Sequence, residues 1–329
     1  MNLKEPQAPE PHWMNEPDQW RTFAFYSANL QCLMPGVPLE QHKAYFEQTQ
    51  RLQDFNSLNN SLEQLDLLKD AKWADGISAP GIVATFHMGP YHLVCGWLMR
   101  QGIPFSLVLS DDIFQHKAAS YSRLYREVTG CATPSEDFGL INAANPHSLF
   151  QMRRAMMKGH LLLVYVDGNT GVRDQSGLPL NFLDGTLRVK TGVAYLSYLM
   201  QCQVYPVLCH WEEKRAQWKA AEPILPYAGE SRQQYVQRCM TVVYGLLADS
   251  LPQYTPQWEG WKYVHHDIHA GDGKPNRRKL DRHMPVTQFM PFTLGSATFL
   301  LERKRLQAYP IPAQVYRRVL SDAKIFFCN

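Results

Sequence analysis

The sequence predicts an α/β protein in which a mostly parallel central sheet is flanked by helices, with N-terminal helices before it and a small C-terminal appendage after it. Between residues 75 and 266, short apolar runs alternate with longer amphipathic segments, as in strand–helix–strand units. The apolar runs show little polar alternation, so we expect strands buried on both faces. With 329 residues and 45% hydrophobic content, the chain can bury a large core.

We expect four parts along the chain. Residues 1–74 form an N-terminal helical region, 75–266 the α/β domain, 267–284 a hydrophilic linker and 285–329 a small C-terminal subdomain. Helical periodicity in the first part predicts helices over Asp18 to Met34, Leu39 to Asp54 and Ser61 to Asp70. In the last part, "ATFLLERKRLQAYPIPAQVYRRVL" predicts a β-hairpin followed by a short helix.

The α/β domain contains four strand-like runs, "GIVATF", "PFSLVLS", "HLLLVYVDG" and "QVYPVLCHWE". The segments between and after them have helical spacing: "HLVCGWLM", Gln115 to Val128, "NPHSLFQMRRAMMKG", "RVKTGVAYLSYLMQC" and Ser231 to Ser250. "NPHSLFQMRRAMMKG" has a proline near its start and a glycine at its end, as a capped helix does. This alternation is what a parallel sheet requires of its connections.

Charge and cysteine usage exclude several classes of protein. The net charge is only +3, so we expect no general polyanion-binding surface and no nucleic-acid partner. Seven cysteines occur at scattered positions, without the short CxxC spacing of redox or zinc sites. We therefore expect them to be reduced residues of the core. No run approaches the roughly 18 apolar residues that span a bilayer, and no apolar signal segment follows Met1. We therefore expect a cytoplasmic location.

Polar side chains directly follow two of the predicted strands. His87 follows "GIVATF", and Asp167 ends the run "LLLVYVD". Because the carboxyl ends of parallel strands meet at one edge of a sheet, we expect both side chains, with His92 five residues after His87, to converge on one cleft. A neutral imidazole there can take a proton from a hydroxyl or an amine. Both residues could instead be purely structural. His87 could be a hydrogen-bonded histidine at a strand end, and Asp167 a turn residue before Gly168.

The order of four motifs resembles that of the lipid A late acyltransferases, a group within the lysophospholipid acyltransferase superfamily. The motifs are "GIVATFHMGPYH", "LLLVYVDGNTG", "LNFLDGTLRVKTGVAYLSYLMQCQVYPVLCHWE" and "TPQWEGWKY". Residue by residue, the resemblance matches His87 to the catalytic histidine, Asp167 and Gly168 to the second-strand acid and glycine, Phe182, Gly185, Gly192 and Ala194 to the acyl site, Pro206 and Val207 to the late strand, and Gln257 and Trp261 to the closing motif. It covers roughly Asp75 to Tyr263, so residues 75–266 would be an acyltransferase-like domain.

The chain departs from the family pattern at one position. The family carries an acid after four intervening residues, whereas this chain has His92 there, giving H-x4-H. In the family that carboxylate orients the imidazole. Here the role could pass to Asp167, or to Asp111 or Asp112, and His92 could instead hold the ring by a hydrogen bond or bind a different acceptor.

The resemblance implies direct acyl transfer in lipid or secondary-metabolite biosynthesis. His87 would deprotonate a hydroxyl or amine acceptor, either a small molecule or a lipid, which then attacks a thioester carried by acyl-CoA or an acyl carrier protein. The thioester is a co-substrate, and no bound cofactor or metal is implied. An oxyanion could be met by backbone N–H groups near Gly89 or by Asn169, and Arg188 and Lys190 could meet a phosphate. Such acceptors would permit peripheral contact with the inner membrane.

The sequence is also compatible with other functions and sites. A noncatalytic binder of acyl or carrier-protein ligands could keep the fold, and a thioesterase would use water as the acceptor. A basic face formed by Arg153, Arg154 and Lys158 could dock an acidic carrier protein, or could be a solvated helix face. The cluster His265, His266, Asp267 and His269 suggests metal by composition, but a second ligand segment is not evident.

Overall fold

The computed structural model describes residues 12–58, 65, 77, 80–131, 136–168, 177–213, 215–268 and 284–328. The helix expected over Ser61 to Asp70 falls outside these residues except for Leu65. Internal contacts divide the chain into two compact units. We call residues 49–180 and 188–259 the sheet unit, and residues 1–48, 181–187 and 260–329 the terminal unit.

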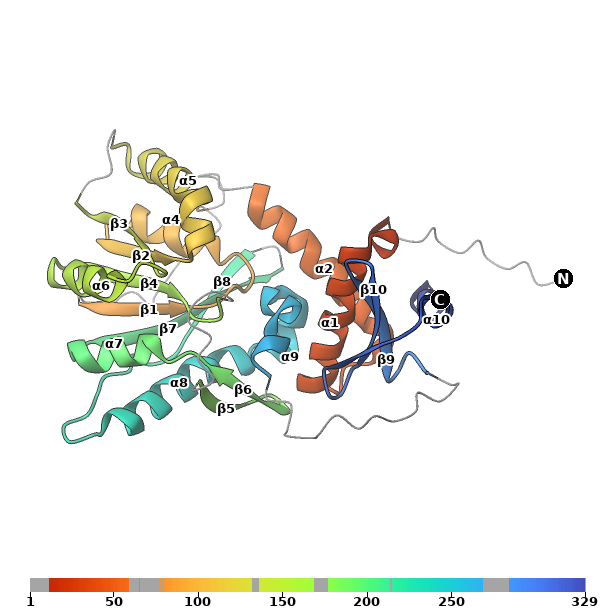
Figure 1. Cartoon of the computed structure of the whole chain (residues 1–329). Helices are drawn as coiled ribbons and strands as arrows, with labels where there is room; N and C mark the ends of the chain where they lie inside the picture. Colours follow the sequence, from red (N-terminus) through yellow and green to blue (C-terminus); the bar gives the residue numbers. More distant parts are fainter. Residues whose placement is uncertain are drawn as a thin grey trace. The chain divides into compact units, whose positions relative to one another are not determined.

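The sheet unit confirms the predicted α/β class. Its six-stranded sheet has the order β3-β2-β4-β1-β7-β8, and every pairing is parallel except that of β7 with β8 (Figure 1). The strands are β1 (Gly81–Thr85), β2 (Phe105–Leu109), β3 (Phe138–Asn142), β4 (Leu161–Tyr165), β7 (Gln203–Glu212) and β8 (Arg215–Ala220). Strands β3 and β8 were not predicted. Both lie at edges of the sheet, where sequence signals are weaker because one side of the strand lacks a partner.

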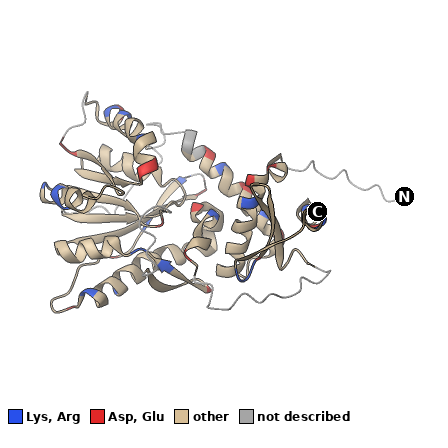
Figure 2. Ribbon diagram, in the orientation of Figure 1, with Lys and Arg blue, Asp and Glu red and all other residues tan. Residues whose placement is uncertain are grey.

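The central strands explain why their runs are apolar throughout. All five residues of β1 are buried, and β1 pairs with β4 on one side and β7 on the other. Strands β1, β2 and β4 contain no charged residue, whereas Lys, Arg, Asp and Glu appear on the helices around them (Figure 2). A strand covered on both faces has no solvent side that could accept polar residues.

Helices cover both faces of this sheet. Their bounds are α4 (His92–Arg100), α5 (Asp111–Thr129), α6 (Ser148–Met157), α7 (Gly192–Met200), α8 (Arg232–Ala248) and α9 (Leu251–Tyr254). Apolar side chains of α4 and α5, including Trp97 and Leu98, pack on the face formed by Val83, Leu107 and Leu163. Helices α6, α7 and α8 contact β4, β1 and β7, on the face to which the alternate strand residues point.

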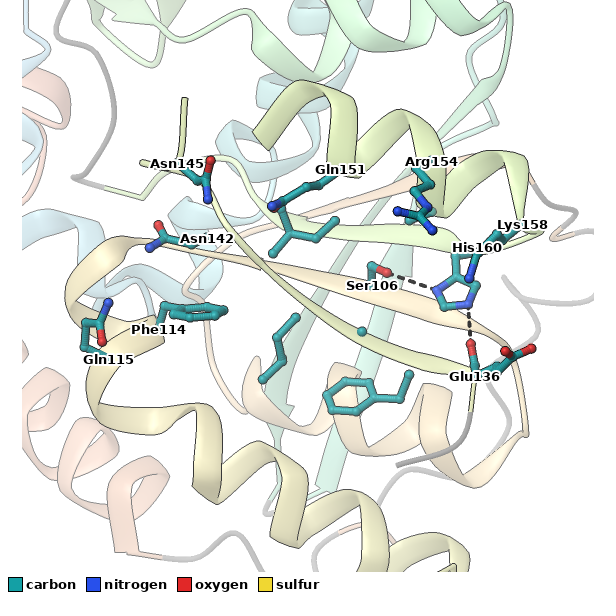
Figure 3. A pocket seen from close by; sticks show the side chains of 15 residues that line it. Ser106, Phe114, Gln115, Glu136, Asn142, Asn145, Gln151, Arg154, Lys158 and His160 are labelled. Atoms are coloured by element: carbon teal, nitrogen blue, oxygen red, sulfur yellow. Dashed lines mark hydrogen bonds between the residues drawn. The ribbon is translucent and has the colours of Figure 1, made fainter. Parts of the chain in front are cut away.

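A buried histidine ties together the edge of the sheet near β3. His160, which precedes β4, contacts the Ser106 hydroxyl through Nδ1 at 3.0 Å and the Glu136 carbonyl through Nε2 at 2.6 Å (Figure 3). Gly139 lies so close to Ser106 that an added Cβ would lie 2.6 Å from its hydroxyl. The His160 hydrogen bonds hold the start of β3 against β2, and glycine at position 139 lets the two strands lie close together.

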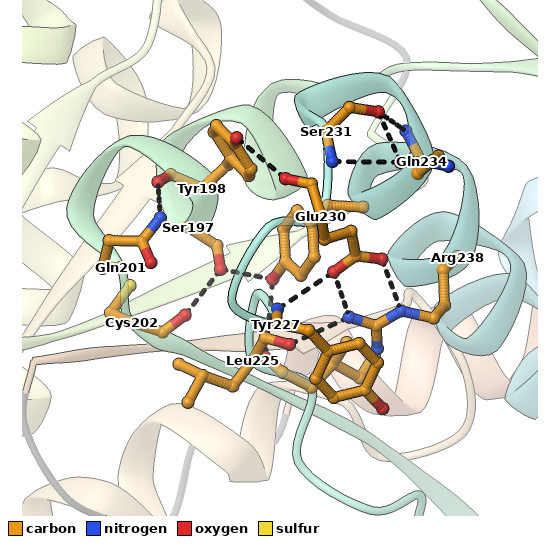
Figure 4. A network of polar contacts seen from close by, with 12 residues as sticks. Ser197, Tyr198, Gln201, Cys202, Leu225, Tyr227, Glu230, Ser231, Gln234 and Arg238 are labelled. Atoms are coloured by element: carbon orange, nitrogen blue, oxygen red, sulfur yellow. Dashed lines mark hydrogen bonds and ion pairs between the residues drawn. The ribbon is translucent and has the colours of Figure 1, made fainter.

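A polar network links α7 to the start of α8 (Figure 4). Arg238 donates from Nε and Nη2 to the two carboxylate oxygens of Glu230, at 2.9 and 2.7 Å. The Tyr198 hydroxyl donates to the Glu230 carbonyl at 3.0 Å, and a capping box of Ser231 and Gln234 begins the helix. This bidentate pair lowers the pKa of Glu230.

One predicted helix was wrong at its start. The segment "RVKTGVAYLSYLMQC" is not one helix, because Arg188 and Val189 belong to strand β6 (Gly185–Val189) and α7 begins only at Gly192. Strand β6 pairs with β5 (Leu178–Phe182) in a two-stranded sheet that the sequence reasoning missed. Helix α5 begins at Asp111, earlier than expected, since the Ser110 hydroxyl caps it by accepting from the Ile113 N–H.

The terminal unit is built from α1 (Pro17–Leu33), the first part of α2 (Leu39–Leu58), a three-stranded antiparallel sheet and short 3-10 turns. The predicted hairpin is confirmed as β10 (Ala297–Glu302) with β11 (Gln307–Pro310), and α10 (Ala313–Cys328) follows it. Strand β9 (Phe289–Leu294) was missed and pairs with β10. The 3-10 turns are η1 (His12–Asn15), η5 (Val264–His266) and η4 (Glu259–Lys262), whose first residue, Glu259, belongs to the sheet unit. The turn η3 (Thr255–Gln257) belongs to the sheet unit as well.

Arg303 is fully buried in the terminal unit and is held by neutral oxygen and nitrogen atoms. Its Nη2 donates to the Ser27 carbonyl at 3.0 Å and to the Ser27 hydroxyl at 2.9 Å, and it lies 3.1 Å from His42 Nδ1. Burial lowers the pKa of Arg303 to about 10, and burial together with the Arg303 charge lowers the pKa of His42 to about 3. Within the described segments, no helix is both long and apolar enough to cross a bilayer.

Candidate active site

The structure brings together His87 and Asp167, as predicted. Strands β1 and β4 are parallel neighbours with Thr85 opposite Tyr165, so each side chain lies two residues beyond the paired strand ends. The His87 ring donates from Nδ1 to Asp167 Oδ1 at 2.8 Å. The aspartate side chain is only 3% exposed and the histidine 25%. The sheet therefore presents a histidine–carboxylate pair at its carboxyl edge.

The carboxylate of Asp167 is held from several directions. The backbone N–H of His87 donates to both of its oxygens, at 3.2 and 3.1 Å. The indole Nε1 of Trp258 donates to Oδ2 at 2.7 Å. A carboxylate fixed in this way fixes the ring that it binds.

The hydrogen bond decides which nitrogen of His87 can act as a base. A carboxylate oxygen only accepts, so Nδ1 carries the proton and Nε2 keeps the lone pair. Burial lowers the pKa of His87, but the charge and hydrogen bond of Asp167 and the charge of Glu259 outweigh it, and the net pKa is raised above its ordinary value. The ring is a stronger base than a free histidine.

The segment after α9 braces the loop that carries His87. The N–H of Gly89 donates to the Gln257 carbonyl at 2.9 Å, and the N–H of Glu259 donates to the His87 carbonyl at 3.0 Å. The side-chain amide of Gln257 bonds both the N–H and the carbonyl of Trp211, at 2.7 and 2.8 Å. The closing motif thus positions the histidine through the backbone.

Gly89, near which we expected oxyanion donors, is itself part of this bracing. Its φ of +53° is in the left-handed region, and an added Cβ would lie 2.7 Å from both the Cys209 carbonyl and His210 Cα. Its N–H already donates to Gln257, and its carbonyl accepts from Asn56 Nδ2 at 2.8 Å. The Gly89 N–H is therefore already used within the protein.

A cavity of about 440 Å³ opens beside His87. This volume is within the usual range for small-molecule sites. Much of its wall is aliphatic and comes from β1, β2, β4, α6 and α7: Ile82, Val108, Leu109, Leu149, Met152, Val164, Val193 and Leu196. Lys190 lines it as well and donates to the Gly168 carbonyl at 2.7 Å. The cavity is therefore largely apolar and has a cation, Lys190, in its wall.

Two tyrosines that the sequence reasoning missed enclose the His87 ring. Tyr165 stacks on it with the ring centroids 4.8 Å apart, and Tyr91 contacts it edge-on at 4.9 Å. The Tyr165 hydroxyl donates to the Tyr91 carbonyl at 3.0 Å. Burial raises the pKa of both phenols, so they remain neutral walls. The only sequence signal for Tyr91 and Tyr165 is their nearness in the chain to His87 and Asp167.

His92 does not join the pair formed by His87 and Asp167. It begins α4, does not line the cavity, and burial lowers its pKa to about 4. Asp111 accepts instead from Asn142 Nδ2 at 2.7 Å, and Asp112 lies 3.2 Å from His116. The orienting role therefore falls to Asp167, one of the candidates that the sequence left open.

The predicted substrate-binding residues are divided. Gly168, Lys190 and Gly192 line the cavity, whereas the exposed Arg188 does not. Phe182 and Gly185 belong to the terminal unit, where a Cβ on Gly185 would lie 2.8 Å from a methyl group of Leu33. Asn169 lies outside the described residues.

The remaining predicted positions have structural contacts. Ala194 is buried in α7, and Pro206 and Val207 are buried in β7. Trp261 is buried in the terminal unit, and its carbonyl accepts from Asn29 at 2.7 Å. His269 is outside the described residues, and no cluster of three or more metal-ligating side chains occurs among those that are described.

No protein-family model matches this chain, and no curated protein is significantly similar to it.

Proposed function

We propose that this protein is an acyltransferase that moves an acyl group from a thioester donor, acyl-CoA or an acyl carrier protein, to a hydroxyl or amine acceptor. The observation that carries the proposal is the 2.8 Å hydrogen bond between His87 Nδ1 and Asp167, at the wall of a largely apolar cavity. The aliphatic wall suits an acyl chain, and the histidine suits an acceptor that must lose a proton.

The chemistry can be written so that atoms and charges balance. Nε2 of His87 accepts the proton of the acceptor as its oxygen or nitrogen attacks the thioester carbonyl carbon. The new C–O or C–N bond forms, the C–S bond breaks, and the imidazolium returns the proton to the departing thiolate. Asp167 stabilises the imidazolium between these steps. The ammonium of Lys190, on the same cavity wall, supplies positive charge for the oxyanion.

The test is to incubate the purified full chain with acyl-CoA or acyl carrier protein and to measure free thiol and acylated acceptor. We expect thiol release to require an alcohol or amine acceptor. His87→Ala should lower it by about 10²- to 10⁴-fold. His116→Ala, the same change at an exposed position on α5, should leave it unchanged. Thiol release that is equal with and without acceptor would indicate a thioesterase. Thioester binding without any turnover would indicate a noncatalytic binder.

A further inference from the structure

A second cavity, of about 580 Å³, lies between α6 and the strands β2 and β3 (Figure 3). We call it the edge groove. It shares no lining residue with the His87 cavity. The two cavities are lined by neighbouring residues of the chain near the carboxyl edge of the sheet. Ile113 and Ala143 line the His87 cavity, whereas Phe114 and Asn142 line the edge groove. The edge groove is thus a separate space that the proposed reaction does not use.

Two cations line the edge groove, Arg154 in the last turn of α6 and Lys158 directly after the helix. They are four residues apart, which places them on the same side of this segment. In the described segments, no carboxylate lies within 4.0 Å of either charge. One acid, Glu136, also lines the groove, and its side chain is exposed. Positive charge therefore exceeds negative charge here.

The rest of the edge groove combines a fixed floor with side-chain amide groups, of which Asn145 already accepts from the His147 N–H through Oδ1 at 2.8 Å. Both ring nitrogens of the buried His160 are occupied, by Ser106 and by the Glu136 carbonyl. Gln151 and Asn145 lie toward the other end (Figure 3), and Phe114 and Phe138 add aromatic surface. Amide and aromatic groups around a pair of cations suit a ligand that has both an anionic group and a polar ring or chain.

We propose that the edge groove binds a phosphorylated small molecule, with its phosphate held between Arg154 and Lys158. A phosphate ester carries up to two negative charges and three acceptor oxygens, so it can satisfy both cations at once. A carboxylate carries one charge and would leave one of the cations unmatched. The inference does not depend on the acyl-transfer chemistry of His87.

The test measures binding of inorganic phosphate and of ADP to the full chain by calorimetry, with acetate as the carboxylate control. We expect Arg154→Gln and Lys158→Gln each to weaken phosphate binding by about tenfold or more, because each removes a charge-assisted contact. Arg153→Gln is the matched control: it removes the same charge from the neighbouring exposed position, which does not line the groove. It should change affinity by less than about twofold.

Two results of these titrations would overturn the proposal. Equal losses in all three variants would show that only the general charge of α6 attracts phosphate, and acetate binding as tightly as phosphate would remove the case for a phosphate site. A third arm tests vesicles of phosphatidylcholine with and without phosphatidylglycerol. Capture by anionic vesicles that requires Arg154 and Lys158, without binding of free phosphate or ADP, would replace the small molecule with a lipid surface. His87→Ala should bind phosphate normally, so a failure of acyl transfer leaves this inference intact.

Discussion

Trp258 and Asp167 are 91 residues apart in the sequence and are joined by a 2.7 Å hydrogen bond from the indole Nε1 to Oδ2. The other carboxylate oxygen accepts from His87 Nδ1. Asp167 thus links the loop that carries His87 to the segment after α9 by hydrogen bonds to both. His87 is positioned by parts of the chain that meet only in the folded protein.

Trp258→Phe should reduce turnover by about tenfold, because it removes one donor to a buried carboxylate but keeps an aromatic ring in place. The expected loss of stability is about 1–3 kcal/mol. Initial rates and urea denaturation measure the two effects. Trp20→Phe is the control, since its indole donates to the Pro291 carbonyl in the terminal unit and its loss should lower stability without changing the rate.

His87→Ala should lower turnover by about 10²- to 10⁴-fold, the usual contribution of a positioned general base. The cavity wall is otherwise unchanged, so a nonreactive thioether analogue of the donor should bind with nearly wild-type affinity. Steady-state kinetics and calorimetry separate these outcomes. Turnover retained in His87→Ala would contradict the general-base role. Loss of analogue binding would indicate that His87 is purely structural.

Asp167→Asn should lower the maximal rate and move the acid limb of the pH profile to lower pH. In the proposed mechanism the base is neutral His87, so activity should rise as pH passes through its pKa, which Asp167 and Glu259 raise. Removing the Asp167 charge lowers that pKa. Glu259→Gln should shift the limb in the same direction, by less. The exposed Asp112→Asn should leave the limb in place, and a limb that does not move in Asp167→Asn would contradict the assignment.

The same pair predicts a pH dependence of stability. Because the folded-state pKa of His87 is raised above 6.5, its pairing with Asp167 adds stability that is complete below pH 6.5 and is lost as pH rises through the raised value. His92 acts in the opposite sense, since its folded-state pKa is lowered to about 4. Its burial costs nothing above pH 6.5 and destabilises the fold progressively as pH falls from 6.5 toward 4.

His92→Gln should therefore make the free energy of unfolding less sensitive to acid. Between pH 6.5 and 4 the wild type should lose up to about 3 kcal/mol through this group, and the variant should not. Urea denaturation across this range measures the difference between the two proteins. An unchanged pH slope in the variant would show that His92 is not the group responsible. Turnover should change little, since His92 does not line the cavity.

Gly89→Ala should destabilise the protein by about 3 kcal/mol or more, because alanine would have to adopt a left-handed φ and its Cβ would meet backbone atoms at 2.7 Å. Gly245→Ala is the matched control in α8, where an added Cβ meets nothing within 4 Å. That change should stabilise by about 0.5–1 kcal/mol. Thermal denaturation distinguishes the two, and similar effects would argue against the braced loop.

Under the proposed acyl-transfer function, Gly192→Leu should shift the preference of the protein toward donors with shorter acyl chains. The exposed Gly192 lines the His87 cavity, and an added Cβ there meets nothing within 4 Å, so leucine can be placed without a clash and we expect its side chain to narrow the cavity. The ratio of kcat/KM for long and short acyl donors measures the effect, with the short donor as an internal control. A uniform loss for all chain lengths would mean that the acyl chain lies elsewhere.

The sequence alone determined the fold class and the two residues at the centre of the site. Uninterrupted apolar runs such as "GIVATF" can be satisfied only by burial on both faces, and parallel strands place their carboxyl ends together, so His87 and Asp167 were predictable from their positions after two strands. Edge strand β3 and hairpin β5–β6 could not be read from the sequence, because short, partly exposed strands carry little periodicity.

Only the tertiary structure decided how the histidine is held. The sequence left several candidates for its partner, among them Asp167, Asp111, Asp112 and His92, and distance selects Asp167. Contacts between segments far apart in the chain also decide three other features. These are the hydrogen bond from Trp258, the packing of Tyr91 and Tyr165 on the His87 ring, and the position of Phe182 and Gly185 in the terminal unit. Local patterns record which residues prefer burial, whereas hydrogen-bond partners are fixed by packing across the whole fold.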